Sequence, residues 1–248
     1  MTDLRLGDCL EVMKLIPDGS IDAIITDPPY GTTACKWDSV IDFDLMWEQL
    51  NRIIKPNGAV VLFGSEPFSS ALRMSNIKNY KYDWKWIKSR PSGHLNAKRM
   101  PMKNIEDICV FYKKQPLYNP QFTEGKPNNV KDGSVRKTEA TNNIYGSFKN
   151  TIQKRTNQKY PKQNLYFSQQ DPRKILHPTQ KPASLMEYLI KTYTNENEIV
   201  LDFTMGSGST GVAAKNLNRK FIGIEQDENY FEIATDRISK EEKQLKIL

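Results

Sequence analysis

Short apolar runs alternate along the chain with segments whose apolar residues recur at helical spacing. Residues 21–26 and 59–63 are almost continuously apolar, as expected for strands that are buried on both faces. Between them, residues 44–54 place their apolar side chains on one face of a helix, which Pro56-Asn57-Gly58 ends. The same patterns predict further strands at 4–6, 82–88, 107–112, 199–202 and 220–224, and further helices at 9–16, 67–74, 182–192, 209–217 and 227–243.

This alternation of strands and helices predicts an α/β fold, with a mostly parallel sheet that helices cover on both faces. The chain has 248 residues, of which 38% are hydrophobic and 26% charged. That length suits one domain, or one domain with a substantial insertion. The composition excludes a disordered, collagen-like or coiled-coil chain, because it can supply an ordinary packed core.

A glycine-rich turn follows one of the predicted strands and opens a helix. Its sequence is Gly206-Ser207-Gly208-Ser209-Thr210-Gly211, and Glu225 lies 19 residues beyond the first glycine, at the end of the next strand. Glycines allow a tight turn and a close approach of the backbone to a ligand, while the carboxylate accepts hydrogen bonds from ribose hydroxyls. The arrangement predicts a site for a cofactor that contains a nucleoside.

Carboxylates end four of the predicted strands. Only 23 residues follow Glu225, which leaves room for one helix and no further crossover unit, so the rest of the sheet must come from the N-terminal region. Placing the strands of residues 199–225 before those of residues 4–63 puts Asp202, Glu225, Asp8 and Asp27 beyond the carboxyl ends of their strands. Open α/β sheets bind their ligands at that edge, so these side chains are expected in one cleft.

The segment Asp27-Pro28-Pro29-Tyr30 directly follows the first buried strand. Consecutive prolines stiffen the turn and offer carbonyl oxygens without competing N–H groups. The Asp27 carboxylate and the Pro28 carbonyl could accept both hydrogens of an exocyclic amine on a base, and the Tyr30 ring could stack on that base. Such an amine is a poor nucleophile, so orientation and acceptance of its developing positive charge are the help it needs.

The positive charge of the chain is concentrated in residues 113–174. This stretch carries 13 Lys and Arg against four acidic residues, a net +9, while the whole chain has a net charge of +7. Polar residues and isolated aromatic residues accompany the charge. The stretch suits either a solvated surface loop or a surface that binds the phosphates and bases of a nucleic acid.

Cysteine usage and the N-terminus indicate a cytoplasmic protein. Cys9, Cys35 and Cys109 are scattered and form no Cys-x-x-Cys pair, which argues against a disulfide framework or a zinc site. The first residues lack the pattern of a secretory signal, and no apolar run is long enough to cross a membrane. We therefore expect no metal and no membrane association.

Three motifs together resemble the β-class DNA amino-methyltransferases, which use S-adenosylmethionine. They are Asp27-Pro28-Pro29-Tyr30 before a basic insertion, the His-Pro-Thr-Gln-Lys-Pro segment at 177–182, and Asp202-Phe203-Thr204-Met205-Gly206-Ser207-Gly208. The resemblance implies a permuted Rossmann-like methyltransferase sheet with helices on both faces and an inserted target recognition region. It places the catalytic half at residues 1–114, the target recognition insertion at 115–172, and the cofactor-binding half at 173–248.

The resemblance also implies roles for single residues. Asp27, Pro28, Pro29 and Tyr30 would bind and orient the target base, with Asp27 also beside the cofactor. The residues implied to line the cofactor are Asp8, His177, Thr179, Lys181, Asp202, Phe203, Gly206, Gly208 and Glu225. One departure is that Phe203 and Thr204 stand where the family usually has Pro and Phe.

By this resemblance the substrate is DNA, and aspartate at position 27 favours methylation of adenine N6 on a flipped-out base. Methylation of cytosine N4 is the main alternative, and a catalytically silent DNA-binding protein or a nicotinamide or flavin oxidoreductase are the others. A homodimer and a cognate restriction endonuclease are candidate partners. The basic residues expected to contact DNA are Lys36, Lys126, Lys131, Arg136, Lys137, Lys154 and Arg155.

Overall fold

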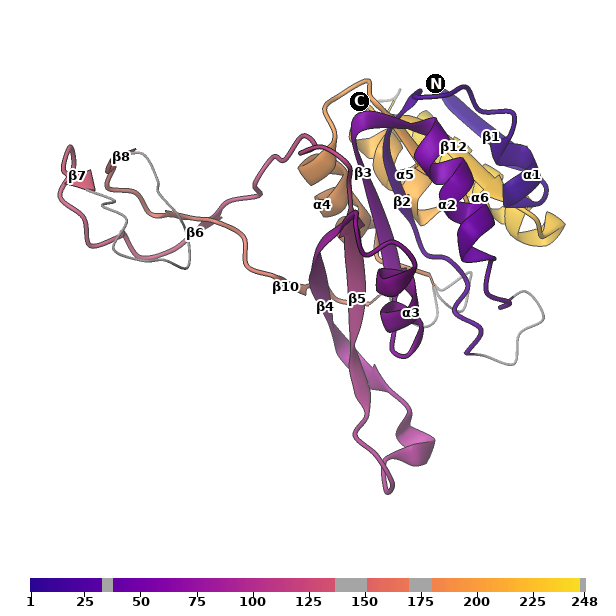
Figure 1. The fold of residues 1–248 in the computed structure, drawn as a ribbon, viewed down its shortest axis with the longest axis horizontal. Coiled ribbons are helices and arrows are strands. Elements are labelled where there is room, and N and C mark those ends of the chain that lie inside the picture. The colour runs from indigo at the N-terminus through magenta and orange to yellow at the C-terminus, as the bar shows by residue number, and fades with distance from the viewer. Residues whose placement is uncertain (33–37, 137–150, 170–179, 246–248) are drawn as a thin grey trace. The chain divides into compact units, whose positions relative to one another are not determined.

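The computed structural model describes residues 1–32, 38–136, 151–169 and 180–245 (Figure 1). These form two compact units: residues 1–119 together with 163–248, and residues 120–162. The second unit falls inside the insertion expected at 115–172, and is shorter than that range at both ends. The first unit contains both ends of the chain and the whole of the central sheet.

Within the described residues, eight strands form one sheet in the first unit. In spatial order they are β1 (Thr2–Leu6), β12 (Lys220–Glu225), β11 (Ile199–Asp202), β2 (Ile21–Thr26), β3 (Ile54–Gly64), β5 (Lys103–Phe111), β4 (Tyr80–Ser92) and β10 (Asn164–Tyr166). The C-terminal strands β11 and β12 therefore lie between the N-terminal strands β1 and β2. This order confirms the permuted methyltransferase sheet, in which the N-terminal region supplies the strands that the C-terminal half lacks.

Helices cover both faces of this sheet, as the sequence predicts. They are α1 (Cys9–Met13), α2 (Phe43–Ile53), α3 (Phe68–Ser75), α4 (Ala183–Tyr193), α5 (Ser209–Asn216) and α6 (Glu228–Leu245). Apolar residues of α1, α2 and α3 share one buried cluster, and those of α4, α5 and α6 share the other. Strand β3 contributes Val60 and Leu62 to the first cluster and Val61 and Phe63 to the second, because successive side chains of a strand point to opposite faces.

One strand near the far end of the sheet runs antiparallel to its neighbours. Strand β5 pairs antiparallel with both β3 and β4, whereas the other strand pairs of this sheet are parallel. β4 and β5 are joined without a crossover α-helix, so they pair as a hairpin. Both strands extend beyond their predicted ranges of 82–88 and 107–112. The sequence did not predict the added residues as strand because they are mostly exposed and polar and carry no apolar pattern.

The second unit contains two short antiparallel ladders. β6 (Thr123–Glu124) pairs with β9 (Gln158–Lys159), and β7 (Val135–Arg136) pairs with β8 (Thr151–Ile152). Side chains of the intervening turns support these ladders: the backbone N–H of Arg155 donates to the Asp132 carboxylate at 3.0 Å. Throughout the described part of the chain, helices long and apolar enough to span a membrane are absent.

Candidate active site

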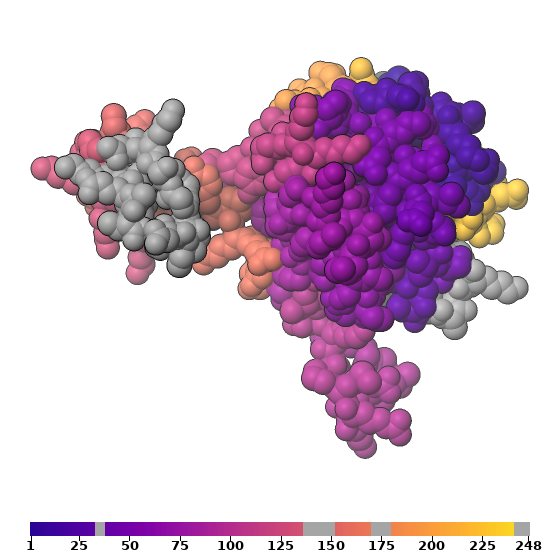
Figure 2. Space-filling model, viewed as in Figure 1, coloured from indigo at the N-terminus to yellow at the C-terminus, as the bar shows by residue number. Residues whose placement is uncertain are grey.

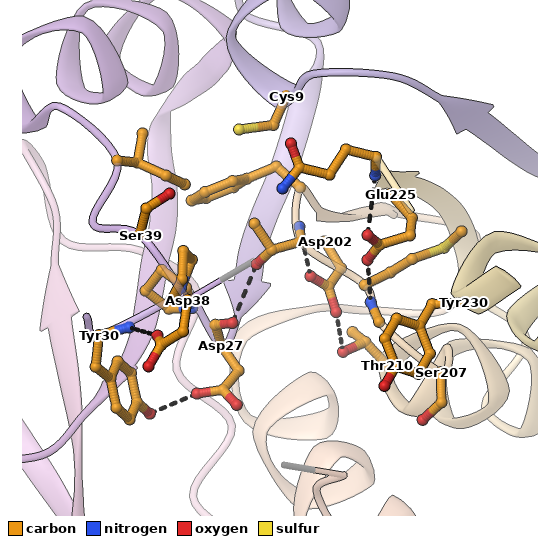
Figure 3. A pocket seen from close by; sticks show the side chains of 18 of the residues that line it. Cys9, Asp27, Tyr30, Asp38, Ser39, Asp202, Ser207, Thr210, Glu225 and Tyr230 are labelled. Carbon is orange, nitrogen blue, oxygen red and sulfur yellow. Dashed lines mark hydrogen bonds between the residues drawn. The ribbon is translucent and has the colours of Figure 1, made fainter. Parts of the chain in front are cut away.

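The four carboxylates that end adjacent strands line one cavity of about 330 Å³. Figure 3 shows Asp27, Asp202 and Glu225 among the residues of its lining. Asp8, Glu225, Asp202 and Asp27 follow or end β1, β12, β11 and β2, which are neighbours in the sheet. A cavity of this size is within the range of small-molecule sites, and it opens at the edge where open α/β sheets bind ligands. The juxtaposition expected from the spacing of the strands is therefore present.

The glycine turn and Glu225 hold one another in place. The backbone N–H of Gly206 donates to the Glu225 carboxylate at 2.8 Å, and the N–H groups of Gln226 and Asp227 donate to its other oxygen at 2.9 Å each. Gly206 has a φ of +51°, a conformation that favours glycine and turns the chain from β11 towards α5. A carboxylate oxygen has a second lone pair, so Glu225 can still accept hydrogen bonds from hydroxyls in the cavity.

Asp202 lies at the floor of the cavity and is almost fully buried. Its carboxylate accepts hydrogen bonds from the hydroxyls of Thr26 and Thr210, both at 2.5 Å, and from the backbone N–H of Thr204 at 3.2 Å. Burial raises the pKa of Asp202 to about 6, although these three donors act to lower it. A cationic group in the cavity would favour the ionised form and would be attracted to it.

The loop that begins at Asp27 is fixed by Asp38. The Asp38 carboxylate accepts from three consecutive backbone N–H groups, those of Tyr30 at 2.7 Å, Gly31 at 2.9 Å and Thr32 at 2.9 Å. The Thr204 hydroxyl also donates to the Asp27 carbonyl at 3.1 Å. We call the segment Asp27-Pro28-Pro29-Tyr30 the Asp27 corner. These bonds connect it to the start of the glycine turn, so both motifs lie against the same cavity.

The Tyr30 side chain supports the Asp27 carboxylate. Its hydroxyl donates to that carboxylate, and its ring stacks on Phe68 with a centroid distance of 5.0 Å and an angle of 30° between the planes. Burial and the adjacent carboxylate raise the pKa of Tyr30, so its hydroxyl stays protonated and can donate. The ring also borders the cavity, where the sequence predicts that it meets a base.

A chain of charged side chains contacts the other oxygen of the Asp27 carboxylate. Lys181 Nζ contacts the Asp27 carboxylate and lies 3.3 Å from Glu106 Oε2, while Lys88 Nζ lies 3.0 Å from Glu106 Oε1. Burial alone would lower the pKa of Lys181, but the carboxylates of Asp27 and Glu106 raise it, so the ammonium remains charged. Burial raises the pKa of Asp27, and Lys181 opposes that rise.

The structure places the other predicted cofactor residues as follows. Asp8 caps α1 by accepting from the N–H groups of Leu10 and Glu11, and its side chain borders the cavity. Phe203 also borders the cavity while packing in the core. Gly208 is not among the residues of the cavity lining, and it packs instead against Ala234 of α6.

The remaining predicted site residues are divided between the cavity, the second unit and the part of the chain that the structure does not describe. Pro28 and Pro29 line the cavity beside Asp27. His177, Thr179, Lys36 and Lys137 lie outside the described residues, and the backbone of Arg136 belongs to β7. Of the basic residues expected to contact DNA, Lys126, Lys131, Lys154 and Arg155 are described with their side chains, and these four are exposed.

Sequence reasoning did not find Glu106, Lys88, Thr26 or Thr210 as parts of the site. Thr210 lies inside the glycine-rich turn and Thr26 directly precedes Asp27, so their positions were available signals. Glu106 and Lys88 lie on the antiparallel strands β5 and β4, and in sequence they look like surface charges. Only the pairing of these strands brings them next to Lys181.

The chemistry of the cavity fits a cofactor with an ammonium group and ribose hydroxyls. Asp202 offers a buried anionic site for a cation, and Glu225 offers acceptors for hydroxyls. The aromatic and thioether side chains of Phe203, Met205 and Tyr230 also line the cavity, as an adenine ring and an alkyl sulfonium require. Groups of three or more potential metal ligands are absent among the described side chains.

Comparison with known proteins places these features in a family. The family model described as DNA methylase, of the N6 and N4 type, matches residues 21–236. The type II methyltransferase M.HpaI of Haemophilus parainfluenzae is 29% identical over 251 residues, covering 96% of this chain and 75% of that protein. A crystal structure of the M1.HpyAVI–SAM complex has a TM-score of 0.63 at 30% identity and covers 96% of this chain and 99% of the other.

The cytosine-N4-specific PvuII DNA methyltransferase has a TM-score of 0.68 at 18% identity, covering 98% of this chain and 90% of the other, and shows likeness of fold. The family match spans Asp27, the glycine turn and Glu225, and it confirms the predicted family and enzyme class. The chain belongs to the N6/N4 family of DNA methylases.

Proposed function

We propose that the protein transfers the methyl group of S-adenosylmethionine to N6 of an adenine that is extruded from duplex DNA. The observation that carries this proposal is that the Asp27 corner, the glycine turn and Glu225 open on one cavity. A base amine held at the corner and a cofactor held at the turn are then neighbours. The same cavity accounts for a nucleoside-containing cofactor and for a second, amine-bearing reactant.

The protein contributes orientation and charge. The Asp27 carboxylate and the Pro28 carbonyl accept the two amine hydrogens, and Tyr30 packs against the base. When bound, S-adenosylmethionine supplies an electrophilic methyl group on a sulfonium. Attack of the amine nitrogen would form the nitrogen–methyl bond as the sulfur–methyl bond breaks. Positive charge would move to the nitrogen beside the Asp27 carboxylate, which stabilises it, and would be lost when the surplus amine proton leaves for solvent. The scheme needs no covalent enzyme intermediate, and the raised pKa of Cys9, about 12 because of burial, makes this cavity-lining thiol a poor nucleophile.

Glu225 would accept hydrogen bonds from the cofactor ribose, and Asp202 would face the cofactor ammonium. Asp8 would lie beside the cofactor adenine, since it borders the cavity next to β12. The backbone at Gly206 would approach the methionine portion, and the family resemblance implies a contact of residues 177–182 with the same portion. Lys181 belongs to this segment, yet its contact with Asp27 supports a role on the base side of the cavity.

The insertion at 115–172 would bind DNA and select the target sequence, between a catalytic half at 1–114 and a cofactor-binding half at 173–248. The net charge of +9 in residues 113–174 supports this division, as do the exposed Lys126, Lys131, Lys154 and Arg155. Arg136, Lys137 and Lys36 are proposed as further DNA contacts. Duplex DNA attracts such a surface through its phosphates.

The proposed partners of the enzyme rest on the family resemblance. It supports a homodimer and a cognate restriction endonuclease as partners, and light scattering of the purified protein tests the first. The cysteines support a cytoplasmic location, because Cys9 and Cys109 are free thiols.

Incubation with methyl-labelled S-adenosylmethionine and unmethylated genomic DNA, followed by nucleoside mass spectrometry, tests the proposal. We expect labelled N6-methyladenine with the wild-type protein and none with Asp27→Ala. Labelled N4-methylcytosine would overturn the assignment of the base. Transfer to neither base, by a protein that still binds DNA, would favour a silent DNA-binding protein.

A further inference from the structure

The hairpin of β4 and β5 extends past the edge of the sheet at which the cavity opens. Gly64, the last residue of β3, pairs with Asp107 of β5, and the two strands are antiparallel. Residues before Asp107 therefore lie beyond the carboxyl end of β3, and so do their partners on β4. We define residues 88–105 as the arm; Figures 1 and 2 show it protruding from the rest of the first unit.

The arm is basic although most of the surrounding unit is not. From residue 84 to residue 105 every charged side chain is a cation, and the four that lie beyond the root of the arm are Arg90, Lys98, Arg99 and Lys103. Outside residues 113–174 the chain has a net charge of −2, so this run of cations is a local excess. Such an excess on a projecting element attracts a polyanion.

The tip of the arm exposes apolar side chains. Leu95 is 88% exposed, Met100 53% and Met102 44%. The chain reverses at Gly93, which has a φ of +88°, and Leu95 lies in the short 3₁₀ helix His94–Asn96 that follows. A leucine this exposed contributes almost no hydrophobic stabilisation to the unit. Apolar side chains that accompany basic ones in this way are used by DNA-binding proteins to wedge between base steps.

The root of the arm contacts the catalytic corner. Lys88 Nζ lies 3.0 Å from Glu106 Oε1 across the hairpin, and Glu106 lies 3.3 Å from Lys181, which contacts Asp27. Leu95 is seven residues beyond Lys88, so an extended strand would carry it no more than about 23 Å from this root. A two-stranded ribbon of this kind also fits the major groove of B-form DNA. The arm thus reaches outwards from the place where the extruded base would enter.

We infer that the arm is a second DNA-contacting element, separate from the insertion, which grips the duplex beside the extruded base. This inference rests on the proposed function. Lys98 and Arg99 contact phosphates, and Leu95 packs against the base stack where the target nucleotide has left it. A second copy of this chain is a poorer occupant, because self-association through the arms would bring like charges together.

The charge of the arm is tested with Lys98→Ala/Arg99→Ala, against Lys78→Ala/Lys81→Ala as the matched control. The control removes two exposed lysines at the opposite end of the same hairpin, before and at the start of β4. Binding of a fluorescein-labelled duplex is measured by anisotropy at several salt concentrations. We expect the arm variant to bind about tenfold more weakly, with a salt slope reduced by about 2, and the control to bind as wild type does. Equal DNA binding by both variants would overturn the proposal. It would also be overturned if the arm variant changed only the oligomeric state of the protein and left its DNA binding unchanged.

The apolar tip is tested with Leu95→Ser and the conservative Leu95→Met, measuring single-turnover methylation of genomic DNA alongside duplex affinity. We expect Leu95→Ser to slow methylation at least fivefold while the dissociation constant changes less than twofold, and Leu95→Met to restore the rate. A wild-type rate for Leu95→Ser would refute the proposed packing of Leu95 against the base stack.

Failure of the arm proposal can be distinguished from failure of the proposed function. If the wild-type protein transfers no methyl group, the proposed function fails; if it does and the arm variants match it, only the arm proposal fails. Affinity for S-adenosylmethionine, unchanged in every arm variant, confirms that each has folded.

Discussion

Asp27 is a partly buried residue whose contacts come from three separate parts of the chain. Tyr30 lies in its own loop, Lys181 is 154 residues away, and the Thr204 hydroxyl holds its carbonyl. Its side chain therefore has one fixed orientation at the cavity. An aspartate fixed in this way can act on a reactant without reorganising first, which is the condition under which electrostatic stabilisation is strongest.

Asp27→Ala should reduce methyl transfer by at least about 10²–10³-fold, the loss expected when a preorganised acceptor of developing charge is removed. Because the side chain acts on the base, the affinity for S-adenosylmethionine should stay within a few-fold of wild type. Single-turnover transfer and calorimetric titration of the cofactor measure the two effects. A large loss of cofactor binding would contradict the assigned role.

Lys181→Gln tests the ion pair. The Lys181 ammonium opposes the rise that burial causes in the pKa of Asp27, so its removal should raise that pKa further. If the ionised Asp27 is the active form, the acidic limb of the kcat/KM profile should move to higher pH, since protonation then occurs at a higher pH than in wild type. Tyr30 and Glu106 also face Asp27, and both are retained in this variant.

Lys181→Arg is the control, because it keeps the charge and should leave the acidic limb near its wild-type position. An unshifted profile in Lys181→Gln, together with a raised KM for S-adenosylmethionine, would assign Lys181 to the cofactor instead. That outcome would agree with the role implied by the resemblance of residues 177–182 to the family segment.

At the scale of elements, the sequence was sufficient to predict the strands of the central sheet except β10, which lies in the basic stretch where no strand was expected. Continuous apolar runs identified β2 and β3, and the acidic residues at the strand ends predicted which strands share a ligand-binding edge. The antiparallel strands were predicted too short, since the outer residues of β4 and β5 are exposed and follow no apolar period. The partners of Lys181 could not be predicted either, because strand pairing, and not local sequence, brings Glu106 to it.

Gly208 lies in the glycine turn and packs against α6, although it does not line the cavity. Its φ of +78° suits glycine, and a Cβ there would lie 3.0 Å from Cβ of Ala234 and 3.2 Å from its Cα. Gly208→Ala should therefore lower the free energy of unfolding by about 1–3 kcal/mol, through backbone strain and displacement of α6.

Gly93→Ala separates these two effects, because Gly93 has a similar φ of +88° and nothing within 4 Å of its added Cβ. Urea denaturation of both variants measures the difference. The Gly208 variant should lose more stability than the Gly93 variant; equal losses would show that contact with α6 contributes nothing.

At the scale of the whole molecule, charge is divided unevenly along the chain. Residues 113–174 carry a net +9 and the remainder carries −2. The acidic part includes the carboxylates of the cavity, and the basic part includes the second unit. Binding of a phosphate backbone should therefore depend on the insertion and respond strongly to salt.

Neutralising Lys154 and Arg155 should weaken DNA binding and reduce the salt slope by about 2 if each contacts one phosphate. Both side chains are exposed in the second unit. Lys78→Ala/Lys81→Ala again serves as the control for a general loss of charge. An unchanged slope would remove Lys154 and Arg155 from the interface, while cofactor binding should be unaffected in either case.

The most direct measurement for the central claim is a crystal structure of the protein with S-adenosylmethionine bound. We predict that the ribose lies at Glu225, the methionine portion lies along the turn at Gly206, and the sulfonium methyl points towards the Asp27 carboxylate. A cofactor bound with its methyl group turned away from Asp27, or bound outside the shared cavity, would contradict it.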